Sequence, residues 1–199
     1  MESTSIRQAL SRGAFHAVLG LAFAAALLLL PRLLVLAALA VATVGFLIFE
    51  AARLRVPSLR RWFSAWFAPL LRKEEEDKLT GSSYFLIGCL ITALAFPQHI
   101  AALAILFLSF GDPTATVVGI WKGRKKLWGR SVEGDIACLI ACILIGILVA
   151  VILKNPSLIV ALVGAIFATL FQALSLRLND NLTIPLGSAA AMMLASISI

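Results

Sequence analysis

The stretch IACLIACILIGILVAVIL, residues Ile136–Leu153, is an unbroken apolar run of 18 residues. A helix of this kind can cross the hydrocarbon core of a bilayer, which takes roughly 17–25 residues. Six similar runs occur elsewhere in the chain, at Ala14–Leu30, Leu33–Phe49, Tyr84–Phe96, Ile100–Phe110, Leu158–Leu176 and Ile184–Ile199. The sequence therefore predicts an all-α polytopic membrane protein with about seven transmembrane segments, of which Tyr84–Phe96 and Ile100–Phe110 are short.

The composition excludes most other classes of protein. Of the 199 residues, 61% are hydrophobic and only 14% are charged, and the mean hydropathy is +1.02. Soluble domains contain about 45–50% apolar residues. A soluble enzyme, a disordered chain and a DNA-binding domain are therefore excluded, and no nucleic-acid partner is expected despite the net charge of +7. The length predicts a single integral-membrane domain over residues 1–199.

The basic residues predict the orientation in the membrane. When the seven runs are taken as spans, all but two of the 17 Lys and Arg residues fall in loops on one side, and the exceptions are Arg32 and Lys154. Cytoplasmic loops collect Lys and Arg. We therefore expect a cytoplasmic N-terminus, a C-terminus outside, and an active site that faces the cytoplasm.

Residues 59–71 predict an interfacial amphipathic helix. Its large apolar residues recur at three- and four-residue spacing, beside two arginines; they are Leu59, Trp62, Phe63, Trp66, Phe67 and Leu70. Such a helix lies in the headgroup layer with its apolar face toward the acyl chains. It is either a plain membrane anchor or a wall that guides a lipid substrate to the site.

The sequence Gly111-Asp112-Pro113 predicts an interruption at membrane depth. Asp followed by Pro is typical of a helix start, so we expect one helix to end near Gly111 and another to restart at Pro113. A broken helix at this depth lines a cavity and not lipid, and an unpaired charge there is costly. Asp112 is therefore either a simple helix cap or a ligand for Mg²⁺, with the helix N-terminus beside it binding phosphate, and we favour the second interpretation.

Four more polar clusters share a position at the predicted cytoplasmic ends of apolar runs. They are Asp180, Asn181 and Thr183 with Pro185; Lys122, Lys125, Arg130 and Glu133; Thr80 with Gly81; and Arg12, His16, Glu50 and Arg53. Each has a plainer interpretation, as a polar turn, a positive-inside loop, a helix cap, a structural ion pair or a histidine at headgroup level. Together they supply carboxylates, basic groups and helix N-termini, which are the groups that phosphoryl transfer uses.

The same clusters carry a resemblance to a known family. The motifs are Arg12 with His16, Glu50 with Arg53, Lys78-Leu79-Thr80-Gly81, Gly111-Asp112-Pro113 with Ala115 and Gly119, Glu133-Gly134, and Asp180-Asn181-Leu182-Thr183-Ile184-Pro185. In this combination the chain resembles the membrane-bound, CTP-dependent lipid-alcohol kinases, which include dolichol kinase, phytol kinase and yeast-type diacylglycerol kinase. It departs from their pattern at Gly13, where Lys is frequent, at Asn179-Asp180, where a pair of acids is more usual, and at Asp135, where a small residue is common.

The resemblance implies transfer of the γ-phosphate of a nucleotide, CTP in this family, to the hydroxyl of a polyprenol, phytol-like or diacylglycerol acceptor. Asp112 and Asp180 would bind Mg²⁺, and Glu133 and His16 would complete the catalytic group. The expected nucleotide and phosphate contacts are Arg12, Thr80, Gly81, Lys122, Lys125, Arg130, Asn181 and Thr183. The expected supporting residues are Glu50, Arg53, Pro113 and Pro185.

Two other functions fit part of the pattern. A phosphatidate cytidylyltransferase-type enzyme also spans the membrane and uses CTP with Mg²⁺, but it forms a CDP-lipid and releases pyrophosphate. A transporter with a broken-helix site is a non-enzymatic alternative, which predicts polar residues in the outer halves of the spans. Those halves are almost purely apolar here, and Gln172, the clearest polar side chain within a span, is near an inner end.

Overall fold

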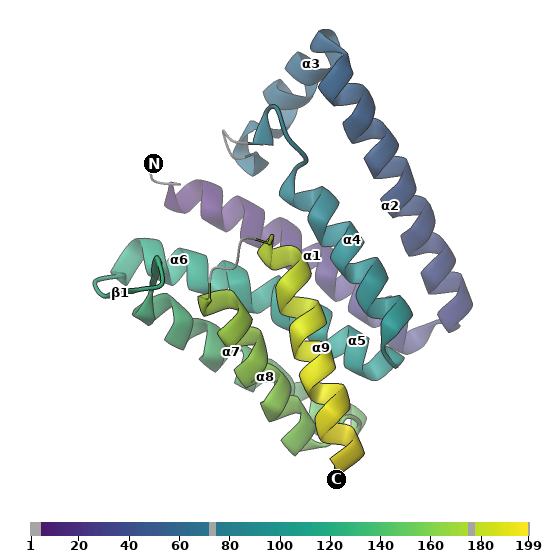
Figure 1. Cartoon of the computed structure of the whole chain (residues 1–199), viewed down its shortest axis with the longest axis vertical. Coiled ribbons are helices and arrows are strands. Elements are labelled where there is room, and N and C mark those ends of the chain that lie inside the picture. The colour runs from purple at the N-terminus through teal and green to yellow at the C-terminus, as the bar shows by residue number, and fades with distance from the viewer. Residues whose placement is uncertain (1–4, 72–74, 175–177, 199) are drawn as a thin grey trace.

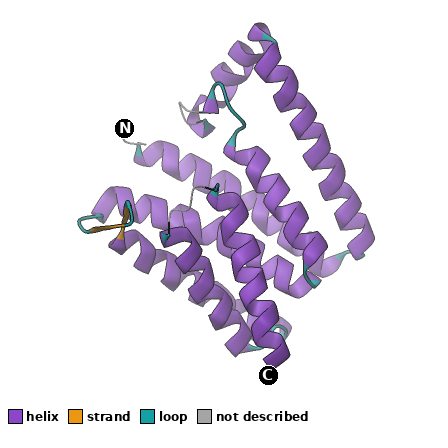
Figure 2. Cartoon of the chain, in the orientation of Figure 1, coloured by secondary structure: helices purple, strands orange, loops and turns teal. Residues whose placement is uncertain are grey.

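The computed structural model describes residues 5–71, 75–174 and 178–198, and nearly all of them are helical, as Figure 1 and Figure 2 show. The elements in chain order are α1 (Ile6–Leu29), α2 (Arg32–Arg55), α3 (Pro57–Phe67), η1 (Ala68–Leu70), α4 (Gly81–Ala95), α5 (Gln98–Leu106), η3 (Phe107–Gly111), α6 (Asp112–Lys122), β1 (Lys126–Leu127), β2 (Arg130–Ser131), α7 (Val132–Leu153), α8 (Leu158–Ala173) and α9 (Asp180–Ser198). Apart from the small β1–β2 hairpin, the described part of the chain is all-α, as predicted.

Five helices of the described chain are long and apolar enough to cross a membrane. They are Ile6–Leu29, Arg32–Arg55, Gln98–Lys122, Val132–Leu153 and Asp180–Ser198. Two more apolar helices, α4 and α8, have 15 and 16 residues. At 1.5 Å per residue these two are about 22–24 Å long, which is less than the hydrocarbon core of about 30 Å. The number of spans and their orientation stay predictions.

The predicted break at Gly111-Asp112-Pro113 is absent, and this part of the expectation is wrong. The helix is continuous over Gln98–Lys122 and contains a π-helical turn at Phe107–Gly111. Asp112 itself has α-helical angles (φ −62°, ψ −45°), so it is not a helix cap. Because proline has no N–H and its ring needs space on the preceding turn, a widened π turn before Pro113 lets the helix continue.

The core of the bundle forms around α5. Residues Ile100–Ile105 have exposed fractions of 0–1%, and α1, α4, α7, α8 and α9 all contact this helix. The alanines in α5 allow close packing of the neighbours, as is common between membrane helices. Large apolar side chains point outward instead on the peripheral helices, for example Leu144 and Val151 on α7. An apolar exterior around a packed core is expected of a bundle that lies in lipid.

Two polar side chains close helix ends on the side opposite the predicted site. Arg32 donates from Nη2 to the carbonyl oxygens of Ala93, Leu94 and Phe96 (3.1–3.2 Å), at the end of α4. Gln98 donates from Nε2 to the carbonyl of Leu27 (2.8 Å), at the end of α1. The last carbonyls of a helix have no partner within it, so the one arginine in this loop satisfies them.

The predicted amphipathic helix is present, although it begins at Pro57 and becomes a 3₁₀ turn at Ala68–Leu70. Its aromatic residues divide between two faces. Phe63 is buried and Phe67 packs on it with ring centroids 4.7 Å apart, whereas Trp62 and Trp66 are exposed. The helix therefore packs on the bundle with one aromatic face and presents the other to its surroundings.

A pair of glycine substitutions tests the packing of α4 on α9. A Cβ added at Gly88 would lie 2.1 Å from the carbonyl oxygen of Asn181, whereas a Cβ at Gly45 on α2 meets nothing within 4 Å. We expect Gly88→Ala to destabilise the protein by about 1–3 kcal/mol through overpacking, and Gly45→Ala to be neutral or stabilising by up to about 1 kcal/mol. Thermal unfolding in detergent measures both, and equal midpoints would contradict this helix contact.

Candidate functional site

Arg130 joins two carboxylates that are far apart in the sequence. Its guanidinium forms an ion pair with Asp180, and Nη1 lies 3.8 Å from Oδ1 of Asp112. Asp112 follows the π turn, and Asp180 is the first residue of α9. All three side chains are mostly buried, with 15–23% exposed. The structure thus brings three predicted site residues into one neighbourhood.

The β1–β2 hairpin explains how Arg130 reaches this position. Trp128 and Gly129 form its two-residue turn and both have positive φ angles, 51° and 87°. Turns of this kind match the twist of paired strands, and Leu127 pairs with Arg130 across them. Ser131 then caps α7 by accepting a hydrogen bond from the amide of Gly134 at 3.0 Å. Arg130 is therefore held between a tight turn and a helix start.

Asp135 is a neighbour of Arg130 that was not among the predicted site residues. It lies in the first turn of α7 and interacts electrostatically with Arg130. Its Oδ1 atom is buried and has no hydrogen-bond partner among the described residues. The signal in the sequence was its departure from the family pattern, because a carboxylate replaces a small residue beside Glu133-Gly134.

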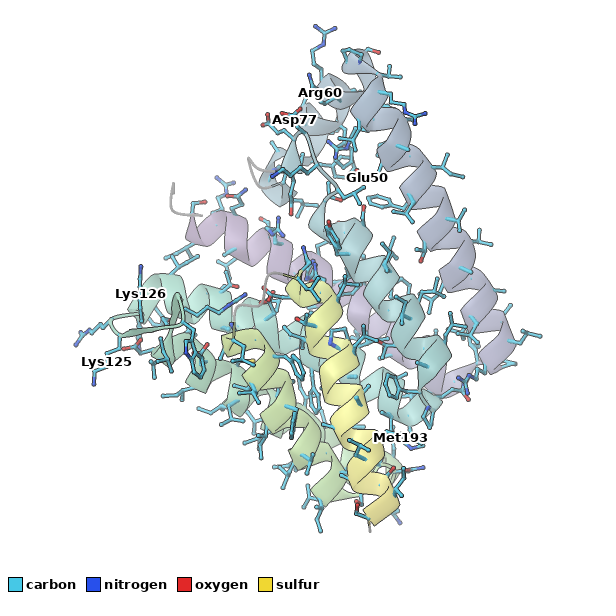
Figure 3. All side chains as sticks on the ribbon, in the orientation of Figure 1. Glu50, Arg60, Asp77, Lys125, Lys126 and Met193 are labelled. Atoms are coloured by element: carbon cyan, nitrogen blue, oxygen red, sulfur yellow. The ribbon has the colours of Figure 1, made fainter. Side chains whose placement is uncertain are left out.

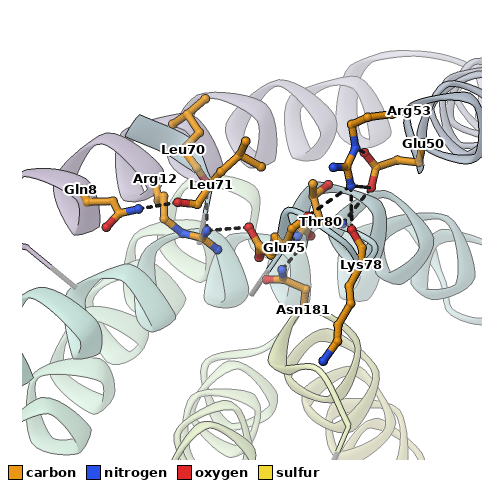
Figure 4. Close-up of polar contacts among 11 residues, drawn as sticks. Gln8, Arg12, Glu50, Arg53, Leu70, Leu71, Glu75, Lys78, Thr80 and Asn181 are labelled. Carbon is orange, nitrogen blue, oxygen red and sulfur yellow. Dashed lines mark hydrogen bonds and ion pairs between the residues drawn. The ribbon is translucent and has the colours of Figure 1, made fainter. Parts of the chain in front are cut away.

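A second cluster links the starts of α4 and α9 to α1, as Figure 4 shows. Arg12 Nη1 lies 3.2 Å from Glu75 Oε2, and Glu75 Oε1 accepts a hydrogen bond from the amide of Gly81 at 3.0 Å. Asn181 Nδ2 donates to the carbonyl oxygen of Gly81 at 2.9 Å. A Cβ at Gly81 would lie 3.0 Å from Arg12 Nη2, so glycine permits this approach.

A third cluster consists of the fully buried Glu50 and Arg53 of α2. Arg53 Nε donates to Glu50 Oε1 at 2.8 Å, and its other nitrogens donate to carbonyl oxygens of the connection before α4, namely those of Glu75, Glu76 and Lys78. Glu50 Oε2 accepts from the amide of Thr80 at 2.8 Å. Because each of the three guanidinium nitrogens of Arg53 has an acceptor within the fold, the pair is a structural one that fixes residues 75–80.

Two adjoining pockets lie at this end of the bundle and share Arg12 and His16. The larger, which we call the aromatic pocket, has a volume of about 90 Å³ and is lined by Arg12, Phe15, His16, Phe46, Phe63, Phe67, Leu70, Leu71, Glu75, Thr80, Gly81 and Ser82. The smaller, which we call the Asp112 pocket, has a volume of about 40 Å³ and is lined by Ala9, Arg12, Gly13, His16, Asp112, Pro113 and Thr116. Thr80 and Gly81, predicted as nucleotide contacts, thus lie in the aromatic pocket.

Glu133 and the two predicted lysines lie around a separate loop. Glu133 accepts hydrogen bonds from the amides of Arg124 (3.0 Å) and Lys125 (3.3 Å) and so holds the connection from α6 to β1. Lys122 packs its ammonium over the ring of Trp121, 4.2 Å from the centroid. Lys125 projects at the edge of the molecule in Figure 3. The described hydrogen bonds of Glu133 are thus with this loop, and the described ring contact of Lys122 is with its neighbour on α6.

The remaining predicted site residues, Pro113, Pro185 and Thr183, lie within the packed helices. Pro113 packs against α1, where a Cβ at Gly13 would lie 2.9 Å from its Cβ atom. Pro185 is accommodated inside α9. Thr183 is buried, and its hydroxyl has no hydrogen-bond partner among the described residues.

The carboxylates suit a metal ion that substrate phosphates help to bind. The described residues contain no group of three or more His, Cys, Asp or Glu side chains that could hold a metal ion. Mg²⁺ in phosphoryl-transfer sites usually takes one or two carboxylates together with phosphate oxygens and waters. Asp112 and Asp180, already gathered around one positive charge, match that smaller donor set.

Breaking the buried ion pair should be far more harmful than breaking an exposed one. Arg53→Met leaves Glu50 buried without its partner, which costs about 3–5 kcal/mol. Arg60→Met removes the partner of Asp77 at the surface near α3 (Figure 3), where ion pairs contribute little. Thermal unfolding in detergent should show a large loss for the first variant and almost none for the second. Equal losses would show that Arg53 does not hold the connection in place.

Comparisons with known proteins point in one direction. No family model matches the chain, and no solved structure matches it. It is similar to the CTP-dependent diacylglycerol kinase 1 of Schizosaccharomyces pombe, with 26% identity over 160 residues, which cover 73% of each chain. It is also similar to an uncharacterized protein of Rickettsia prowazekii, with 29% identity over 165 residues, or 80% of this chain and 81% of that protein. The distant similarity to the diacylglycerol kinase supports a kinase family at most, and the second relative adds no function.

Proposed function

We propose that this chain is an integral-membrane lipid kinase that transfers the γ-phosphate of CTP to the hydroxyl of a lipid alcohol at the cytoplasmic face. The observation that carries the proposal is the grouping of Asp180 and Asp112 around Arg130, with Asp112 lining a small polar pocket that adjoins the aromatic pocket. A phosphate donor and an apolar acceptor require two such regions next to each other. The similarity to a CTP-dependent diacylglycerol kinase supports the same reaction.

The phosphates of the nucleotide would bind on the Asp112 side. Catalysis of phosphoryl transfer depends mainly on positioning and on stabilising charge, and Arg12 and Arg130 supply positive charge there. Asp112 and Asp180 would hold Mg²⁺, which neutralises charge on the phosphate oxygens. When substrate binds, the carboxylates that now pair with Arg130 would turn to the metal, and the guanidinium would turn to the phosphates.

The transfer itself needs a proton acceptor near both substrates. The oxygen of the lipid hydroxyl attacks the γ-phosphorus, the bond from that phosphorus to the bridging oxygen breaks, and CDP leaves. We assign the hydroxyl proton to His16, because this residue lines both pockets. Burial beside Phe85, with ring centroids 4.9 Å apart, holds the imidazole in place.

The position of the label in CTP distinguishes the proposed reaction from cytidylyl transfer. Purified protein in liposomes, given Mg²⁺ and diacylglycerol, phytol or a polyprenol, should move label from γ-labelled CTP into a lipid phosphate and release CDP. With α-labelled CTP the lipid should stay unlabelled. Label from the α position in a lipid formed from phosphatidate would establish a cytidylyltransferase and would overturn the kinase.

Removing the charge of either carboxylate beside Arg130, Asp112 or Asp180, should stop the reaction. Asp112→Asn and Asp180→Asn each keep the size of the side chain but remove a charge that would bind the metal, so we expect kcat to fall by at least about 100-fold. Asp77→Asn is the matched control, because Asp77 is exposed and pairs with Arg60 outside both pockets. Size-exclusion profiles and unfolding midpoints verify folding. Full activity in a folded Asp112→Asn variant would exclude Asp112 from the reaction.

A further inference from the structure

We propose that the aromatic pocket is the binding site of the lipid acceptor, and that the side-chain hydroxyl of Thr80 holds the acceptor's hydroxyl. This inference rests on the proposed kinase function and assigns to Thr80 a role toward the lipid, where the sequence predicted one toward the nucleotide. The pocket's composition matches such a ligand: Arg12, His16, Glu75, Thr80, Gly81 and Ser82 form its polar part, and phenylalanine and leucine side chains form the rest.

The hydroxyl of Thr80 is a buried polar group for which the described part of the chain supplies no partner. Thr80 is only 3% exposed, and its Oγ1 atom is buried without a hydrogen-bond partner among the described residues. Leaving such a group unpaired is unfavourable. The amide of Thr80 donates to Glu50 Oε2 at 2.8 Å, which fixes the backbone at this position. A bound hydroxyl in the adjoining pocket satisfies this atom, since both groups can donate and accept.

The rest of the pocket fits a hydrocarbon chain. Phe46 comes from α2, and Phe63 and Phe67 come from α3. Phe63 is buried and Phe67 is 38% exposed, whereas Trp62 and Trp66 are 50% and 73% exposed, as expected of residues at the headgroup level. A hydrocarbon chain with one hydroxyl end is the ligand that this lining complements.

The position of the polar part connects the acceptor to the phosphate site. Arg12 and His16 line both the aromatic pocket and the Asp112 pocket. Arg12 also pairs with Glu75, whose other oxygen binds the amide of Gly81, the residue after Thr80. A hydroxyl held at Thr80 is thus separated from the Asp112 side only by the two residues that the pockets share.

Two variants of Thr80 test whether its hydroxyl holds the lipid acceptor during the kinase reaction. Thr80→Val keeps the shape but removes the hydroxyl, so we expect KM for the lipid alcohol to rise roughly tenfold with little change in KM for CTP. Thr80→Ser keeps the hydroxyl and should restore KM for the lipid. A rise in KM for CTP equal to that for the lipid, or a serine variant as impaired as the valine variant, would overturn the role of Thr80.

A binding measurement that needs no catalysis tests the pocket itself. Wild-type protein in liposomes is irradiated with a diazirine-bearing diacylglycerol, and the labelled peptides are mapped by mass spectrometry. We expect label on the segments with Phe46, Phe63 and Phe67, and severalfold less label in Phe67→Ala than in the control Trp66→Ala, which changes the outer face of the same helix. Label spread evenly over lipid-facing helices, or equal labelling of the two variants, would overturn the pocket.

The two proposals fail in different ways. If wild-type protein captures the probe in the aromatic pocket but transfers no phosphate from CTP to any lipid alcohol, the kinase function is wrong and the lipid site stands. If it phosphorylates diacylglycerol while the label avoids the pocket, the kinase stands and the acceptor site is wrong.

Discussion

A buried charge has to be paired. The positions of Glu75, Thr80 and Gly81 depend on how the buried Arg53 is paired. In the low-dielectric interior an isolated guanidinium is very costly. Arg53 pairs with Glu50 on its own helix and uses its remaining donors on three backbone carbonyls of the connection before α4. These hydrogen bonds hold residues 75–80 against α2. This arrangement presents Glu75 to Arg12, and Thr80 and Gly81 to the aromatic pocket.

The first helix then divides the site into two regions. Arg12 and His16 lie one turn apart on α1, and both line the Asp112 pocket as well as the aromatic pocket. Gly13, between them, allows α6 to approach, because a larger residue would meet Pro113. A glycine at this point is thus explained by packing, and the close contact of α1 with α6 keeps Asp112 beside the shared wall.

The sequence predicted the helical class, the apolar runs and most of the polar residues that meet at one end. It did so because apolar length and charge placement are local properties that the bilayer selects strongly. It could not predict the π turn before Pro113, because Asp-Pro is equally compatible with a helix start and with a widened helix. It also could not separate Glu133 from Asp112 and Asp180. The hydrogen bonds from Arg124 and Lys125 that engage Glu133 depend on a two-residue hairpin turn, which has only a weak signal in a membrane sequence.

Arg53 and Arg130 differ in burial and in how completely their hydrogen-bond donors are satisfied. Arg53 is fully buried and its donors all have partners within the fold, so no ligand could replace Glu50 without leaving a charge unpaired. Arg130 is 23% exposed, meets Asp112 at 3.8 Å, and has a buried Nε atom with no hydrogen-bond partner in the described part of the chain. Its interactions are incomplete, and a phosphate could complete them while a metal ion replaces the guanidinium between the carboxylates. An exchange of this kind costs less where a guanidinium is partly exposed and incompletely hydrogen-bonded, as Arg130 is and Arg53 is not.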